Sequence, residues 1–200
     1  MRRLVVFGIA AVVAGACSSD SRSPVQPESI SVPVQFTSDK HTGTPHNHSV
    51  HLSGDEEVFT GAPPTPADSN AQGQAIFHVA EDGQSIDYKL IVSNIENLTQ
   101  AHIHCGPRGV IGPIVVWLYP SPSATAIQLI PGRHDGVLVE GTINATVDPP
   151  TSNHVSPTTS VNCPGGVASL ADVLARIREG NAYVNVHTTA FPVGEVRGQF

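Results

Sequence analysis

The chain has 200 residues, a formal net charge of −7, 40% hydrophobic residues and 14% charged residues. This length suggests one domain with attached segments, and the hydrophobic share is large enough to form a core. The acidic balance argues against nucleic acid as a partner, because phosphates require a basic surface, and against electrostatic adsorption to anionic lipid.

Residues 1–16 have the features of a bacterial secretory signal. Arg2 and Arg3 precede the apolar stretch LVVFGIAAVVAGA, which is too short to span a bilayer comfortably. The sequence AGAC, ending at Cys17, resembles a lipobox, in which the cysteine is lipid-modified and becomes the new N-terminus. An ordinary secretory signal cut nearby is the alternative. Loss of the two arginines changes the net charge from −7 to −9, so we expect attachment to the membrane of the cell envelope through the lipid alone, facing the periplasm or the outside.

The cysteine count predicts a disulfide. Of the three cysteines, Cys17 is used by the anchor, which leaves Cys105 and Cys163 in an oxidising compartment. Their bond would close a loop of roughly 60 residues and stabilise the fold by roughly 4 kcal/mol in the chain-entropy model. Cys105 therefore has a structural role that needs no metal.

Residues 17–49 are expected to form a disordered tether. The segment is rich in Ser, Pro and Thr and has no apolar periodicity. It runs into the tract HTGTPHNHSVH, residues 41–51, whose histidines either bind metal loosely or form part of a polar linker.

Short strands between turns are expected in the domain that follows, residues 50–200. The helix is expected to begin at Ser169, with Asp172 completing a capping-box-like start. Its apolar face consists of Leu170, Val173, Leu174 and Ile177. The expected strands cover residues 50–58, 74–80, 85–93, 99–105, 112–119, 136–147, 182–188 and 194–200, and the helix covers 169–180. This pattern predicts an all-β, antiparallel, Greek-key-like sandwich or barrel with one short helix before the last two strands.

Five segments of the chain carry a family resemblance. They read HLSGDEEV, GQAIFHVAEDGQSIDYKLIVSNI, AHIHCGPRGVIGPIVVWLY, LADVLARIREGNAYVNVHT and FPVGEVRGQF. In this order they resemble the CHRD (chordin) domain over about residues 50–200, and the chain is identified as a bacterial lipoprotein member of that family. GDEEV stands here where many members read Gly-Ala-x-Glu-Val.

The resemblance implies a fold and a compartment, and no established catalytic activity. The residues themselves show no Gly-x-Ser-x-Gly elbow and no phosphate-binding loop, so no catalytic residue is expected. The first hypothesis is therefore a non-enzymatic binding or structural module of the cell envelope, without a certain cofactor, whose partner is an unknown protein or other extracellular ligand.

A metal site is the second hypothesis. His102 and His104 are two residues apart on an expected strand, so both side chains lie on one face. If the strand that contains His187 is a neighbour, three imidazoles can converge and bind Cu or Zn. Three nitrogens within roughly 3–4 Å of one another, with an open fourth position, would favour the metal; a purely structural role for the three histidines is the alternative. Glu195 is expected either to orient an imidazole or to pair with Arg197 or Arg108.

The histidine pattern is also similar to the copper half of Cu,Zn superoxide dismutase. Both have His-x-His before a Gly-rich turn and a later strand that ends in Val-x-Val-His. The sequence has no counterpart of that enzyme's bridging histidine or zinc loop, since His134 and His154 lie in loop-like contexts. Superoxide-dismutase-like redox chemistry is therefore only an extension of the metal-binding hypothesis.

Overall fold

The computed structural model describes residues 47–146 and 154–200. The expected signal, the lipidation site Cys17 and residues 17–46 of the expected tether lie outside the described residues, as do residues 147–153. Within the described ranges, no helix has the length and apolar character that crossing a membrane requires.

The described fold consists almost entirely of antiparallel strands. The strands are β1 (Asn47–Ser53), β2 (Gln72–Val79), β3 (Ser85–Cys105), β4 (Ile114–Tyr119), β5 (Ile130–Asn144), β6 (Ala182–Thr188) and β7 (Val196–Gln199). The helix α1 (Leu170–Arg178) precedes the last two strands, and two 3₁₀ turns, η1 (Gly54–Glu56) and η2 (Pro66–Asp68), follow β1. The predicted all-β fold with one short helix is confirmed.

β3 is a single strand of 21 residues, where the sequence predicts two strands, 85–93 and 99–105. Asn94 and Asn97 have φ angles of 56° and 51°, a left-handed conformation that asparagine tolerates better than most residues. Around these two residues, the pairing of β3 with β5 changes register twice. The prediction of two strands is wrong because the asparagines bend the strand without ending it.

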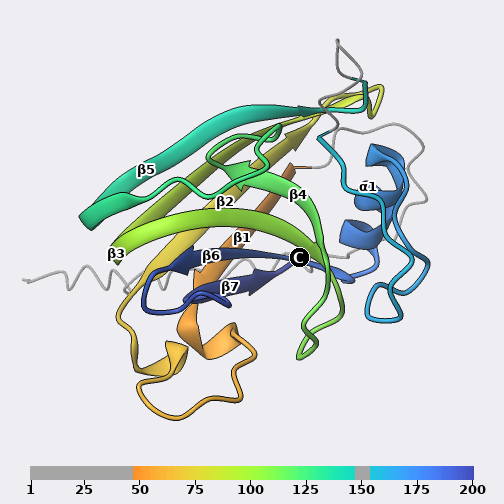
Figure 1. Ribbon diagram of the computed structural model, residues 1–200. Helices are drawn as coiled ribbons and strands as arrows, with labels where there is room; N and C mark the ends of the chain where they lie inside the picture. Colours follow the sequence, from red (N-terminus) through yellow and green to blue (C-terminus); the bar gives the residue numbers. More distant parts are fainter. Residues whose placement is uncertain (1–46, 147–153) are drawn as a thin grey trace, which may run out of the picture. The chain divides into compact units, whose positions relative to one another are not determined.

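The length of β3 closes the sheet. Its first half pairs with β2 from Ile86 to Ser93, and its second half pairs with β6 from Leu98 to Cys105. Since β2, β1, β7 and β6 are neighbours in that order, β3 joins the two ends of the series. On its other edge, β3 pairs with β5 and then with β4 (Figure 1).

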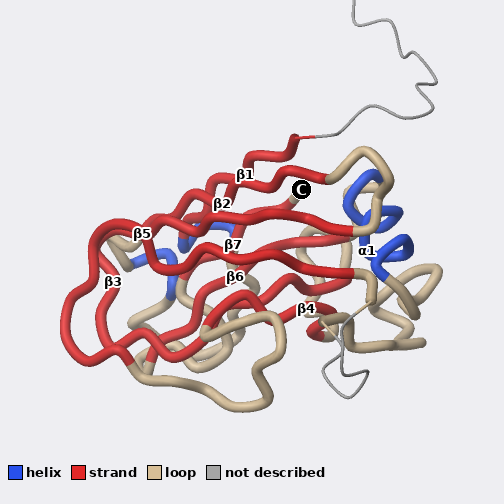
Figure 2. Tube along the Cα trace, turned by 90° about the horizontal axis from the view of Figure 1, so that it is seen from above, coloured by secondary structure: helices blue, strands red, loops and turns tan. Residues whose placement is uncertain are grey.

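The apolar core follows the predicted periodicities. The alternating residues of β3 and the apolar face of α1 are both buried, and α1 lies at one end of the strands (Figure 2). Ser169 caps the helix by accepting a hydrogen bond from the backbone N–H of Asp172. These buried residues are Ile86, Tyr88, Leu90 and Val92 in β3, and Leu170, Val173, Leu174 and Ile177 in α1.

The predicted disulfide between Cys105 and Cys163 is confirmed, with a Cα–Cα distance of 5.1 Å. Cys105 is the last residue of β3, directly after His104. Both cysteines are buried. The bond therefore ties the segment that follows residue 153 to the end of the strand that carries the two histidines.

Candidate metal centre

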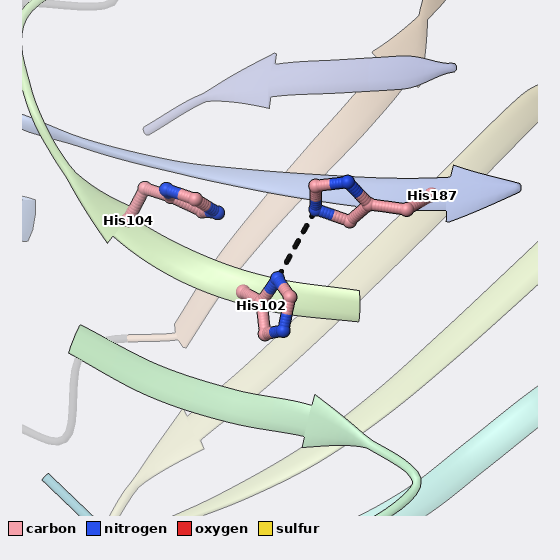
Figure 3. A group of neighbouring side chains, drawn as sticks. All are labelled: His102, His104 and His187. Atoms are coloured by element: carbon pink, nitrogen blue, oxygen red, sulfur yellow. Dashed lines mark hydrogen bonds between the residues drawn. The ribbon is translucent and has the colours of Figure 1, made fainter. Parts of the chain in front are cut away.

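His102, His104 and His187 lie together, with one ring nitrogen from each within 4.8 Å of the other two. His102 Nδ1 and His187 Nε2 are 3.1 Å apart. Figure 3 shows one ring nitrogen of each of the three side chains facing the other two rings. The strand neighbours required by the metal hypothesis are therefore present, and the convergence is slightly looser than the 3–4 Å expected of a bound ion.

Strand register brings the histidines together. Residues opposite each other in antiparallel strands point to the same side of the sheet. His102 is opposite Asn185 of β6 on one edge of β3 and opposite Trp117 of β4 on the other, while His104 is opposite Tyr183. His187 is two residues beyond Asn185 and therefore on the same side. This side of the sheet carries a polar and aromatic cluster, whereas the alternating valines and isoleucines form the core.

The environment of His104 determines which of its nitrogens is free. Its Nδ1 lies 2.9 Å from the carbonyl oxygen of Gly112, so Nδ1 carries the proton and donates. The ring stacks on Tyr183 with an interplanar angle of 12°, and the Tyr183 hydroxyl accepts a hydrogen bond from the backbone N–H of Gly112. The other nitrogen, Nε2, is buried without a hydrogen-bond partner among the described residues. His104 thus presents an unused lone pair to the cluster.

His187 is held in the same way by a backbone carbonyl. Its Nδ1 is 3.0 Å from the oxygen of Pro192 and donates to it. Nε2 then carries a lone pair, yet it lies 2.9 Å from Oδ1 of Asn185, which is another acceptor. The Nδ1–H of His102 can donate to His187 Nε2, but it cannot at the same time serve Asn185 Oδ1. A neutral imidazole has a single N–H, so the cluster has more acceptors than protons.

Burial keeps the three imidazoles uncharged. Desolvation, followed by the neighbouring imidazoles His187 and His104, lowers the pKa of His102 to about 2. Burial is also the main cause that lowers the pKa of His104 and of His187 to about 4 each. Neutral imidazole is the form that binds metal ions, so at neutral pH no proton has to be displaced from a charged ring.

Two charged side chains lie just beyond the imidazoles. The guanidinium carbon of Arg197 is 3.4 Å from the centre of the Tyr183 ring, and its N–H groups donate to the carbonyl oxygens of Pro107 and Val110. Glu57 accepts a long hydrogen bond of 3.4 Å from Asn185 Nδ2, and its other oxygen is buried without a partner among the described residues. Burial raises the pKa of Glu57 to about 7, although Asn185 and Arg197 act to lower it.

The hydrogen-bond partner of Glu195 is neither an imidazole nor one of the arginines that the sequence suggested. Glu195 accepts a hydrogen bond of 2.6 Å from the Ser69 hydroxyl, and Arg108 instead forms an ion pair with Glu56. The groups that orient the imidazoles are backbone carbonyls, which carry no sequence signal. Among the described residues, neither His134 nor His154 belongs to the cluster.

Asn185, Glu57, Gly112 and Arg197 complete the surroundings, and the sequence assigns none of them to the site. Only Asn185 has a local signal, since it alternates with His187 on one face of its strand. Gly112 is required by close packing, because a Cβ atom there would lie 1.8 Å from the carbonyl oxygen of Cys105.

One comparison with known proteins gives a match. The family model of the CHRD domain matches residues 48–200. No curated protein and no solved structure matches the chain.

Proposed function

The chain belongs to the CHRD domain family, and we propose that its β-sandwich binds one transition-metal ion, copper or zinc, through His102, His104 and His187. The single observation that carries this proposal is the excess of lone pairs in the cluster. His104 Nε2 has no donor, and His187 Nε2 faces both His102 Nδ1 and Asn185 Oδ1. A buried acceptor without a donor is costly, and a cation shared by the three imidazoles gives the Nε2 lone pairs of His104 and His187 a partner.

The spacing is compatible with such an ion. Nitrogen atoms that share one zinc or copper ion at about 2.0–2.1 Å lie about 3.3–3.6 Å from one another. The pair at 3.1 Å already approaches this value, and a shift of about 1 Å closes the rest of the set, which spans 4.8 Å. Transfer of the His102 proton from Nδ1 to Nε2, which has no hydrogen-bond partner among the described residues, gives the other neutral tautomer and frees Nδ1 for the ion.

The burial of the cluster favours binding over turnover. His102 is 0% exposed, and His104 and His187 are 7% and 5% exposed. A catalytic metal needs a position that is open to substrate, and these side chains leave little room for one. We therefore regard the domain as a non-enzymatic module, and the superoxide-dismutase-like extension as the weaker candidate.

The first test measures metal content. The full-length chain, purified in detergent without a histidine tag and dialysed against copper or zinc salts, is expected to bind one ion per chain. His102→Gln and His187→Gln are each expected to weaken binding by at least about tenfold, because each removes a ligand. Copper should also quench the fluorescence of Trp117, the only tryptophan, whose ring centroid is 4.3 Å from that of His102.

Two controls identify the site. His78→Gln removes an exposed imidazole and should leave the stoichiometry at one. A variant with His41 and His46 replaced by serine removes part of the histidine-rich tract and should also retain the ion. Binding that disappears with the tract but survives His102→Gln would contradict the proposal.

The location of the module is a separate proposal. We propose that residues 1–16 direct secretion and that lipid at Cys17 holds the domain in the bacterial cell envelope, where it meets a protein or other extracellular ligand. The motivation is the positive start, the short apolar stretch and the AGAC sequence.

Cys17→Ser is expected to release the protein from the membrane fraction and to abolish the mass increase due to acyl chains, since no other lipid attachment site is expected. Fractionation and intact mass spectrometry provide the measurements. Ser18→Ala keeps the modified cysteine and should behave as wild type. An unchanged membrane partition of Cys17→Ser would rule out the anchor.

A further inference from the structure

The three imidazoles bring no negative charge to the ion that they would bind. Among the described residues, the cluster of ligating side chains contains no carboxylate and no thiolate, and Cys105, the nearest cysteine in sequence, is in a disulfide. The carboxyl of Glu57 contacts Asn185 rather than an imidazole. An ion bound to the three nitrogens therefore keeps its full charge.

A fixed positive charge lies behind one ligand. Arg197 is 1% exposed and sits over Tyr183, which itself stacks on His104 with a centroid distance of 4.8 Å. Two backbone carbonyls hold the guanidinium in place. Its pKa is lowered by burial, yet arginine remains protonated at neutral pH. When Glu57 is ionised, its charge offsets that of Arg197, and the surroundings as a whole remain without net negative charge.

Because the site is buried, the free energy of placing an ion there depends strongly on the charge of the ion. The cost of moving an ion from water into a poorly polarisable interior rises with the square of its charge, so a divalent ion costs about four times as much as a monovalent ion of the same size. Repulsion by Arg197 adds to this difference, because it doubles with the charge. The faces and edges of Trp117 and Tyr183 line the cluster, and aromatic rings compensate only weakly for a cation.

The number of ligands points the same way. Zinc held by three histidines takes a water molecule as its fourth ligand, and the burial of the three rings leaves little room for one, whereas monovalent copper is satisfied by two or three ligands. The described residues supply three histidine nitrogens and no fourth His, Cys, Asp or Glu. The one further donor beside them is the neutral amide oxygen of Asn185.

We infer that the cluster selects monovalent copper, Cu(I), over Zn(II) and Cu(II). This inference rests on the proposed function, since it names the ion of the same site. The selection comes from neutral ligands, the fixed charge of Arg197 and the near-complete burial of the three rings.

The test is a set of titrations of the full-length, untagged protein in detergent. Cu(I) is titrated anaerobically in competition with bicinchoninate, and Zn(II) and Cu(II) are titrated separately against chromophoric chelators. We expect one Cu(I) per chain, bound at least about tenfold more tightly than either divalent ion. Equal or tighter binding of Zn(II) or Cu(II) would overturn the inference and leave the proposed function standing. Failure of all three ions to bind at one per chain would overturn both.

Asn185→Asp tests the physical cause. The change is isosteric and places one negative charge beside His187 Nε2, which is 2.9 Å from the present amide oxygen. It is expected to tighten Zn(II) and Cu(II) binding by about tenfold or more and to change Cu(I) binding much less. Asn94→Asp adds the same charge at an exposed position and should leave all three affinities unchanged. If Asn185→Asp left the affinities for all three ions unchanged, charge would not be the basis on which the site selects Cu(I).

Discussion

Replacement of Cys105 and Cys163 together by alanine is expected to lower the free energy of unfolding by about 4 kcal/mol. The bond links residues 58 apart in the sequence, and its loss returns the corresponding loop entropy to the unfolded chain. Alanine is the appropriate substitute because both positions are buried, where a serine hydroxyl would need a partner. Urea unfolding of the oxidised wild type and of the double variant measures the difference.

The same variant should weaken metal binding. The disulfide lies directly after His104 and at the start of the loop that supplies the Gly112 carbonyl to that imidazole. Val161→Ser, at a highly exposed position two residues from Cys163, is the matched control and should change neither property. A loss of stability below about 1 kcal/mol would show that the loop gains little from the cross-link.

The metal-free protein is expected to lose roughly 5 kcal/mol of stability between pH 7 and pH 4.5. The three imidazoles have pKa values lowered from 6.5 to about 2 for His102 and to about 4 for both His104 and His187. Below pH 6.5 the imidazoles of the unfolded chain bind protons, whereas those of the folded chain stay neutral until a lower pH. The free energy of unfolding therefore decreases as the pH falls. Each imidazole contributes on the order of 2–3 kcal/mol to this loss by pH 4.5.

Glu57 acts in the opposite direction. Its pKa is raised from 4.5 to about 7, so the folded state keeps a proton that the unfolded state releases, and the protein is destabilised as the pH rises from 4.5 to 7. Lowering the pH removes this penalty and offsets on the order of 2–3 kcal/mol, about the contribution of one imidazole. Glu57→Gln should therefore stabilise the metal-free protein at pH 7 and steepen its acid sensitivity.

Urea unfolding at half-unit pH steps provides the measurement. His102→Gln should reduce the number of protons taken up on unfolding below pH 6.5 by about one, which makes the slope of stability against pH smaller. A metal-free wild type as stable at pH 4.5 as at pH 7 would mean that the imidazoles are not desolvated as the fold requires.

Part of the site follows from local sequence. The alternation of His102 with Ile103 and His104 predicts two imidazoles on one face, and YVNVHT predicts that His187 shares a face with Asn185. Strand periodicity is a property of neighbouring residues, so it can be predicted without knowledge of the fold. The Cys105–Cys163 bond was predictable for a different reason, because only two cysteines remained in an oxidising compartment.

Local sequence does not predict where a strand ends when its pairing with distant segments determines its length. Asn94 and Asn97 have the composition of a turn, yet β3 continues through them because it pairs with β5 on both sides of the bend. The expected strand over 50–58 ends at Ser53, where η1 begins and carries the chain toward Glu57. In β3, pairing between distant segments overrides the preference of the residues.

The sequence by itself determined the fold class, the apolar faces of β3 and α1, the cysteine pair and which histidines were candidates. Only the tertiary structure decided which nitrogen of each imidazole is free, since the carbonyls of Gly112 and Pro192 hold the others. It also decided the charge of the site, because Glu57 meets Asn185 across 128 residues of sequence. Periodicity specifies the face on which a side chain lies, whereas register and loop packing specify what it meets there.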